Sequence, residues 1–224
     1  MIARFFHAWE HRLVAVDTNR IVRPFEWGLD WLNKPNDHTD LPATRLERWA
    51  TSALSDPKWF DPAPCEDYAL RGDQLTFPSA IKTPHAENNT VYARYFPADR
   101  RGPRRRATLV MPQWNADSDG HVRLCQLLSL VGISALRLSL PYHDDRMPPE
   151  LVRADFIVSP NIGRTLQVNR QAVLDARRAI AWLAAQGYED IGILGTSLGS
   201  CLAALTAAHE PLVKTAALNH IPPY

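Results

Sequence analysis

The sequence predicts an α/β protein built on a doubly wound, mainly parallel sheet. Within residues 73–224, short apolar runs alternate with longer helical stretches, and glycine or proline follows each helical stretch. Strands that alternate with helices form right-handed βαβ units around a parallel sheet. The first 72 residues differ in character, because five of the seven tryptophans lie there between proline-rich segments.

Residues 1–72 are expected to form a helical extension that packs its aromatic side chains on the main domain. Short helices are predicted around 3–15, 24–32 and 43–54, separated by loops rich in proline and aspartate. A cap over an active site is the alternative interpretation of this extension.

Residues 73–224 are expected to form the main domain, with six strands predicted from runs of apolar and β-branched residues. Two strands are expected within 75–81 and 90–98. Four near-continuous apolar runs, typical of strands buried on both faces, follow at 107–112, 133–141, 191–195 and 213–220. Helices are predicted over 119–131, 165–186 and 198–210, and they end at Gly132, Gly187 and Pro211.

Composition and net charge bear on which partners and cofactors the protein is expected to bind. Hydrophobic residues make up 46% and charged residues 22% of the 224 residues, and the formal net charge is +1, so no overall field favours nucleic acid or an anionic membrane as a partner. The N-terminus shows neither a secretory signal nor a membrane-spanning run. Three widely spaced cysteines indicate reduced, buried side chains in a cytoplasmic protein. The sequence contains no nucleotide-binding motif, so no cofactor is predicted.

The arginine-rich turn over 100–106 is the most basic stretch of the chain. Arginines in such a cluster are usually solvated, and contact with phosphate groups is the alternative. No aromatic residues are interleaved with these arginines, as they would be in many nucleic-acid sites. The turn is therefore interpreted as a solvated loop.

The stretch "IGILGTSLGSCLAAL" (191–205) places Ser197 between Gly195 and Gly199, where a strand gives way to a helix. At such a turn the hydroxyl projects from the carboxyl edge of the sheet, where parallel α/β sheets bind ligands. Side chains two positions before and after the serine would collide with the adjoining strand and helix, so both positions need glycine. The pattern predicts a nucleophilic serine. A turn that only permits close packing, and Cys201 as a thiol nucleophile, are the alternatives.

This motif resembles the nucleophile elbow of the α/β-hydrolase superfamily, and the resemblance covers residues 75–224. Two longer stretches, "ISALRLSLPYHDDRMP" and "GRTLQVNRQAVLDARRAIAWLAAQGYEDIGILGTSLGS", are similar to the abhydrolase-domain-18-type branch and its bacterial relatives. The resemblance implies a serine hydrolase that acts on an ester, thioester or similar acyl substrate, or an acyltransferase on the same fold. A non-catalytic module that keeps the fold without a complete triad is the rival interpretation.

Acyl transfer needs two N–H donors for the oxygen that becomes negative. The resemblance implies that one donor is the main-chain N–H of Leu198 and that the other lies in the loop after strand 107–112. Trp114 is the first choice in that loop and Gln113 the second, because Pro112 and Gln113 stand where the superfamily usually has a His-Gly pair.

The loop after the next strand, "PYHDD" (141–145), is expected at the rim of the same site. His143 and Asp144 are therefore candidate pocket residues. A polar loop is the plain interpretation, and substrate contact, a catalytic base or a metal ligand are the alternatives. No metal is predicted, because no third ligand stands at a metal-site spacing.

A serine nucleophile needs a histidine that is oriented by a carboxylate. In the superfamily both follow the serine, and after Ser197 the chain offers only His209, Glu210 and His220. The first two are expected at the far end of the following helix, ~18 Å away at ~1.5 Å per residue. His220 is predicted to end the adjacent strand and to line the pocket; a role as base and a plain surface or core position are the alternatives.

The acid and the histidine are therefore expected beyond residue 224, and the chain is predicted to be a C-terminally shortened hydrolase. Strand 213–220 would then form a bare apolar edge, which favours self-association. A small-molecule acyl substrate is the other partner that the sequence predicts.

Overall fold

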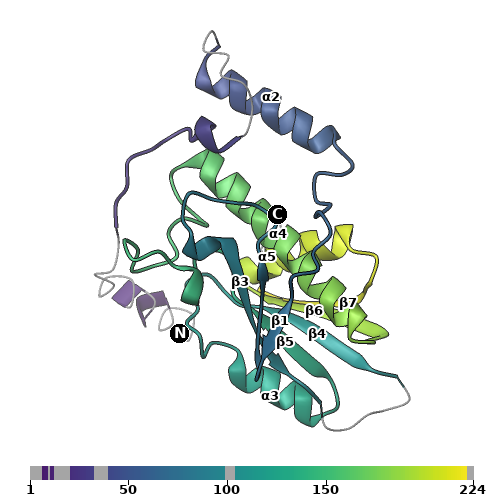
Figure 1. Ribbon diagram of the computed structural model, residues 1–224. Coiled ribbons are helices and arrows are strands. Elements are labelled where there is room, and N and C mark those ends of the chain that lie inside the picture. Colours follow the sequence, from purple (N-terminus) through teal and green to yellow (C-terminus); the bar gives the residue numbers. More distant parts are fainter. Residues whose placement is uncertain (1–6, 10, 13–20, 33–39, 99–103, 221–224) are drawn as a thin grey trace.

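A computed structural model describes residues 7–9, 11–12, 21–32, 40–98 and 104–220 of the protein. The described residues form a seven-stranded sheet in the order β1-β2-β3-β5-β4-β6-β7. Helices α4 and α5 lie on one face of the sheet and α3 lies on the other (Figure 1). The predicted doubly wound α/β class is confirmed. The predicted helix 3–15 falls mostly outside the described residues.

The strands agree with the predicted runs, with one addition. They are β1 (Ala69–Arg71), β2 (Gln74–Pro78), β3 (Thr90–Phe96), β4 (Arg106–Met111), β5 (Ser134–Leu138), β6 (Asp190–Thr196) and β7 (Val213–Asn219). β4 pairs in parallel with β5 and β6, and β6 pairs in parallel with β7, while β1, β2 and β3 join by antiparallel pairing. The sequence analysis missed β1, because its three residues are all exposed and show no apolar alternation.

Three α-helices of the main domain follow the predicted pattern: α3 (Val122–Leu130), α4 (Ile162–Ala185) and α5 (Leu198–His209). Gly132 and Gly187 follow α3 and α4 with φ of 86° and 81°, which is the left-handed conformation that glycine adopts most readily after a helix. Helix α2 (Pro42–Ser55) lies in the predicted N-terminal extension, where residues 7–9 and 11–12 are also helical. The described residues further include the short 3₁₀ turns η1 (Leu29–Leu32), η2 (Glu87–Asn89) and η3 (Asp144–Arg146).

The predicted helix 24–32 is wrong except for its last turn, which is η1. Glu26 instead forms a parallel bridge with Asn161 at the start of α4. Gly28 has a φ of 62°, and a Cβ atom there would lie 1.8 Å from Oδ1 of Asn161, while a Cβ on Gly163 would lie 1.9 Å from the Gly28 carbonyl oxygen. This close contact between two segments far apart in the sequence holds the chain extended and overrides local helix propensity.

The main core lies between the sheet and the helices α4 and α5. Fully buried side chains from the strands, among them Leu109, Met111 and Leu136, pack there against Val173 and Ile180 of α4. A smaller cluster on the opposite face contains Val110, Val122, Cys125 and Ala135 under α3. Both faces of the central strands are thus covered, as the continuous apolar runs predict.

The N-terminal extension packs part of its aromatic surface on α4. Trp49 of α2 is buried and lies edge-to-face against Trp59 at 5.1 Å, and the guanidinium of Arg170 in α4 lies 3.8 Å from the centre of the Trp59 ring. Figure 1 shows α2 at the outer side of α4, on the layer farthest from the sheet. The division of the chain at residue 72 stays a prediction.

The three cysteines carry no disulfide, and Cys125 is buried while Cys65 and Cys201 are half-buried. The expectation of buried thiols is therefore confirmed for Cys125 alone. No helix within the described segments is long and apolar enough to cross a bilayer. At the sheet edge, every residue of β7 except Val213 is exposed.

Candidate active site

Backbone strain gathers at the carboxyl edge of the parallel strands. Among the described non-glycine residues, those with positive φ all follow the carboxyl end of β4, β5, β6 or β7: Asn115, His121, Tyr142, Asp144, Ser197 and His220. Such conformations cost about 1–3 kcal/mol each and cluster at functional sites. This edge is also where parallel α/β sheets bind ligands. The carboxyl edge of the parallel strands is therefore the place of the candidate site.

Ser197 forms the one-residue junction between β6 and α5. Its φ of 52° and ψ of −119° reverse the chain, and its N–H donates to the Asn219 carbonyl oxygen at 2.9 Å. A serine at a helix N-cap usually accepts a hydrogen bond from the first turn. The Ser197 side chain makes no such bond and has no other hydrogen-bond partner in the described part of the chain. The described part of the fold therefore makes no use of its hydroxyl.

The two glycines that flank Ser197 are sterically required. A Cβ atom on Gly195 would lie 2.2 Å from the Gly199 carbonyl oxygen. A Cβ on Gly199 would lie 2.2 Å and 2.4 Å from the carbonyl oxygens of Met111 and Pro112. Real Cβ atoms do not come this close to a backbone oxygen, so the first turn of α5 rests directly on the loop after β4.

The same contact brings the predicted oxyanion donors toward one another. The main-chain N–H groups of Leu198, Gln113 and Trp114 have no acceptor among the described residues. Leu198 begins α5, where the helix dipole adds partial positive charge. The Trp114 indole packs away from this loop, because its Nε1 donates to the Ala154 carbonyl oxygen at 2.9 Å. The main chain of Trp114 stays available for the predicted role.

His143 is buried within the fold, and its expected place in the pocket stays a prediction. Its side chain is 1% exposed. Nδ1 contacts the Pro141 carbonyl oxygen at 2.9 Å, and Nε2 accepts the Asn115 N–H at 2.9 Å, so the ring is neutral with its proton on Nδ1. Burial lowers the pKa of His143 below its ordinary value of 6.5. Because both ring nitrogens are occupied, His143 braces the loop after β4.

Asp144 lines a polar cavity but is tied into the fold. Its Oδ2 accepts from Nη1 of Arg137 at 2.8 Å and from the Ser139 hydroxyl. Arg137 also donates through Nε to the Gly120 carbonyl oxygen at 2.7 Å. Among the described residues, no group of three or more histidine, cysteine or acidic side chains is placed to hold a metal ion.

His121 is a site residue that the sequence analysis missed. Its Nε2 lies 2.9 Å from Oγ1 of Thr196, the residue before Ser197. Burial, and then the positive charge of Arg137, lower the pKa of His121. The base was expected after Ser197, with the loop 141–145 as an alternative, whereas His121 lies in the loop after β4. The available signal was the position of His121 in the loop after β4, although glycine precedes the histidine here and the order of a His-Gly pair is reversed.

The histidines that follow Ser197 take different positions. His209 ends α5 and packs its ring 4.7 Å from that of Phe60, and Glu210 pairs with Arg177 at 3.0 Å. His220 follows β7 with an exposed side chain and a φ of 65°. It directly follows Asn219, whose carbonyl oxygen accepts the Ser197 N–H. A pocket role for His220 stays a prediction.

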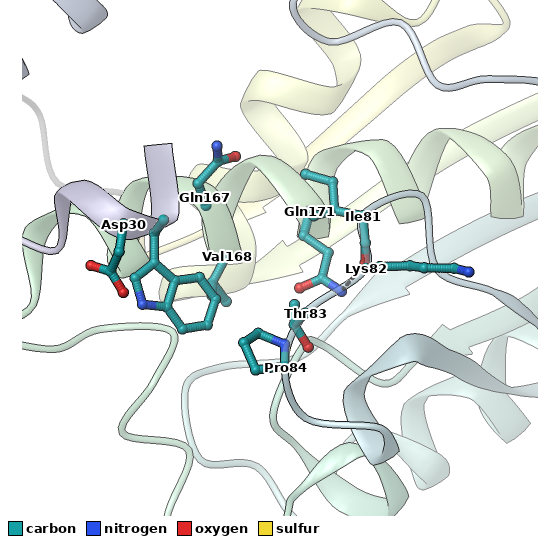
Figure 2. A pocket seen from close by; sticks show the side chains of 9 residues that line it. Asp30, Ile81, Lys82, Thr83, Pro84, Gln167, Val168 and Gln171 are labelled. Atoms are coloured by element: carbon teal, nitrogen blue, oxygen red, sulfur yellow. Dashed lines mark hydrogen bonds between the residues drawn. The ribbon is translucent and has the colours of Figure 1, made fainter. Parts of the chain in front are cut away.

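A separate cavity of about 270 Å³ lies between α4, η1 and the segment that joins β2 to β3. Figure 2 shows its lining, in which Val168 and Gln171 come from α4 and the Lys82 side chain extends away from Val168. None of the residues predicted for the site, Ser197 included, lines this cavity. The cavity and the Ser197 turn are therefore distinct features of the carboxyl edge.

Comparison with known proteins identifies the fold. No protein-family model and no curated protein matches the sequence. Among solved structures, acetyl xylan esterase 1 from Thermoanaerobacterium sp. JW/SL YS485 is similar with a TM-score of 0.50 at 15% identity, over 76% of this chain and 56% of that one. A Bacteroides fragilis protein assigned as an acetyl xylan esterase has a TM-score of 0.54 at 14% identity, over 84% of this chain and 58% of that one.

These two likenesses show the fold that the resemblance implied. The chain spans a little over half the length of either structure. Together with the mostly parallel seven-stranded sheet, they show that the chain has the α/β-hydrolase fold. The narrower similarity to the abhydrolase-domain-18-type branch stays a prediction.

Proposed function

We propose that this chain, which has the α/β-hydrolase fold, is a serine hydrolase of carboxylic esters, thioesters or similar acyl substrates, with Ser197 as the nucleophile. The main support is the state of the Ser197 hydroxyl. It stands at a sharp strand-to-helix turn that two sterically required glycines permit, and no described residue forms a hydrogen bond with it. Serine at such a turn is the arrangement that nucleophilic catalysis on this fold requires.

In the proposed mechanism Ser197 Oγ attacks the acyl carbonyl and forms a tetrahedral intermediate. The main-chain N–H of Leu198, with that of Trp114 or Gln113, would stabilise the oxygen that becomes negative. The contact of Gly199 with Met111 and Pro112 supports this pairing, because it fixes the loop after β4 against the first turn of α5. Donors held in advance need no reorganisation when the charge develops.

The general base is proposed to lie beyond residue 224, together with its acid partner. Two of the described histidines near this edge already make contacts within the fold. His143 has both ring nitrogens in hydrogen bonds, and His121 contacts Thr196. A base must reach the hydroxyl within about 3 Å or through one water. A substrate-assisted route or a base from a second polypeptide would need the same Ser197 geometry.

A fluorophosphonate probe tests the proposal, because it labels only an activated serine. We expect labelling of the folded protein at Ser197 and none in Ser197→Ala. Ser118→Ala is the matched control, since Ser118 is an exposed serine near the same edge, and it should keep full labelling. Labelling that is no faster than in denatured protein would overturn the proposal.

The second candidate is a non-catalytic module with the same fold. The observation that favours it is that Ser197 Oγ has no histidine as hydrogen-bond partner among the described residues. Absence of probe labelling, with an unchanged thermal midpoint in Ser197→Ala, is the result expected for such a module.

A further inference from the structure

A second polar cavity, of about 370 Å³, opens on the sheet face that carries α3. Its walls come from β1, β2, β3 and β5, from the turn before α3 and from η3. Four aspartates and three arginines line it, together with serine, glutamine and tyrosine side chains. Its volume is at the lower end of the roughly 300–1,000 Å³ typical of small-molecule sites.

Part of this charged lining is already paired. Arg137 and Asp144 form an ion pair at 2.8 Å, with side chains 3% and 6% exposed. Arg94 and Asp73 form a more exposed pair at 2.7 Å. These pairs fix the shape of the cavity, because they join β5 to η3 and β3 to the β1–β2 turn.

The remaining polar groups have free hydrogen-bonding capacity. Asp119, Asp145 and Arg71 form no ion pair with any described residue. Oδ1 of Asp144 is buried and has no hydrogen-bond partner within the described segments. A buried acceptor that stays unsatisfied costs about 1–3 kcal/mol. The exposed carboxylates of Asp119 and Asp145 can accept hydrogen bonds from a donor that enters the cavity.

The cavity lining carries both positive and negative charges, and this mixture favours one class of ligand. A cation would meet the guanidinium groups of Arg71, Arg94 and Arg137, and an anion would meet four carboxylates. A neutral molecule that carries many hydroxyl groups fits both, because each hydroxyl donates to a carboxylate and accepts from a guanidinium. The ring of Tyr92, which also lines the cavity, offers an apolar surface for the C–H face of such a molecule.

We propose that this cavity is a binding site for a neutral polyhydroxylated ligand, such as the pyranose units of a saccharide. It borders the turn that leads into His121, whose ring contacts Thr196 beside Ser197. The proposal does not depend on catalysis by Ser197.

Titration calorimetry with cellobiose tests this assignment. We expect saturable binding with a Kd in the millimolar range. Asp119→Ala and Asp145→Ala should each weaken binding by about tenfold or more, because each variant loses hydrogen bonds to a charged group. Asp67→Ala, at an exposed aspartate outside the cavity, is the matched control and should leave the Kd unchanged.

Three results would overturn the proposal: no binding of cellobiose at 50-fold the expected Kd, an equal loss of binding in Asp67→Ala, or tighter binding of putrescine or inorganic phosphate than of cellobiose. Thermal midpoints of all variants show whether a loss comes from unfolding. Ser197→Ala should bind cellobiose like the unaltered protein, so failure of this site and failure of the proposed serine chemistry are distinguishable.

Discussion

Two junctions leave the same edge of the sheet and lead to helices on the same face, yet they are stabilised in opposite ways. The β6–α5 junction consists of Ser197 alone and depends on the absence of side chains at Gly195 and Gly199. The β5–α4 junction runs through residues 139–161 and is held by buried polar contacts.

Three of these contacts illustrate how the long junction is held. Arg146 of η3 pairs with Asp175 of α4 at 2.9 Å, with both side chains fully buried. The ring of His143 joins the junction to the loop after β4, and the Asn161 side chain caps α4 by accepting the Arg164 N–H at 2.9 Å. The short junction is therefore sensitive to side-chain atoms added at Gly195 or Gly199. The long junction is instead sensitive to the loss of a partner from its buried polar contacts.

The largest effect is expected at the buried pair of the long junction. Asp175→Ala leaves the Arg146 charge buried without its partner and should lower the free energy of unfolding by about 4 kcal/mol. Asp73→Ala removes the exposed partner of Arg94 and should cost less than about 1 kcal/mol. Urea unfolding of both variants measures the difference. Equal losses would mean that the long junction does not depend on its buried charges.

The short junction is tested by adding one methyl group. Gly199→Ala forces a Cβ against the Met111 and Pro112 carbonyl oxygens and should cost about 3 kcal/mol. Gly72→Ala is the control: Gly72 also has a positive φ, of 63°, but no atom lies within 4 Å of the added Cβ, so only backbone strain of about 1 kcal/mol is expected. If thermal unfolding gives the same loss for both, steric contact is not what the glycine provides.

Acid should weaken the long junction through His143. Burial lowers the pKa of His143 in the folded state below the 6.5 of an ordinary histidine, so the unfolded chain binds more protons below about pH 6.5. The free energy of unfolding should therefore fall as the pH drops through 6.5, by at most about 1.4 kcal/mol per pH unit from this residue. His143→Gln, which keeps an acceptor but does not titrate, should show a shallower slope in urea unfolding between pH 7 and pH 5.

His121 contributes to the same slope, because burial lowers its pKa as well. A residual pH dependence in His143→Gln is therefore expected. A slope identical to that of the unaltered protein would contradict the role given to His143.

The smallest changes in the free energy of unfolding are expected at the N-cap positions of α4 and α5, which are Asn161 and Ser197. Asn161→Ala removes a capping hydrogen bond and should lower the free energy of unfolding by about 1 kcal/mol. Ser197→Ala should change it by less than about 0.5 kcal/mol, because the Ser197 hydroxyl caps nothing. Differential scanning calorimetry measures both. A large loss in Ser197→Ala would show that the hydroxyl has a structural role after all.

Much of the architecture could be predicted from local patterns. The apolar runs of β4, β5, β6 and β7 and the glycines after α3 and α4 have local causes, namely burial on both faces and left-handed helix ends. The extended segment around Glu26 could not be predicted, because its partner is Asn161, far along the chain. The contact of His121 with Thr196 likewise joins residues 75 positions apart in the sequence.

By itself, the sequence determined the α/β class and the strand-to-helix turn at Ser197, because both follow from residue spacing and from where glycine replaces a side chain. Only the tertiary structure decided which polar residues face a cavity and which are bound within the fold. His143 became a neutral brace, Asp144 the partner of Arg137, and Asp119 a free carboxylate. The physical reason is that hydrogen bonding and burial depend on neighbours that chain folding brings together, and no local pattern specifies them.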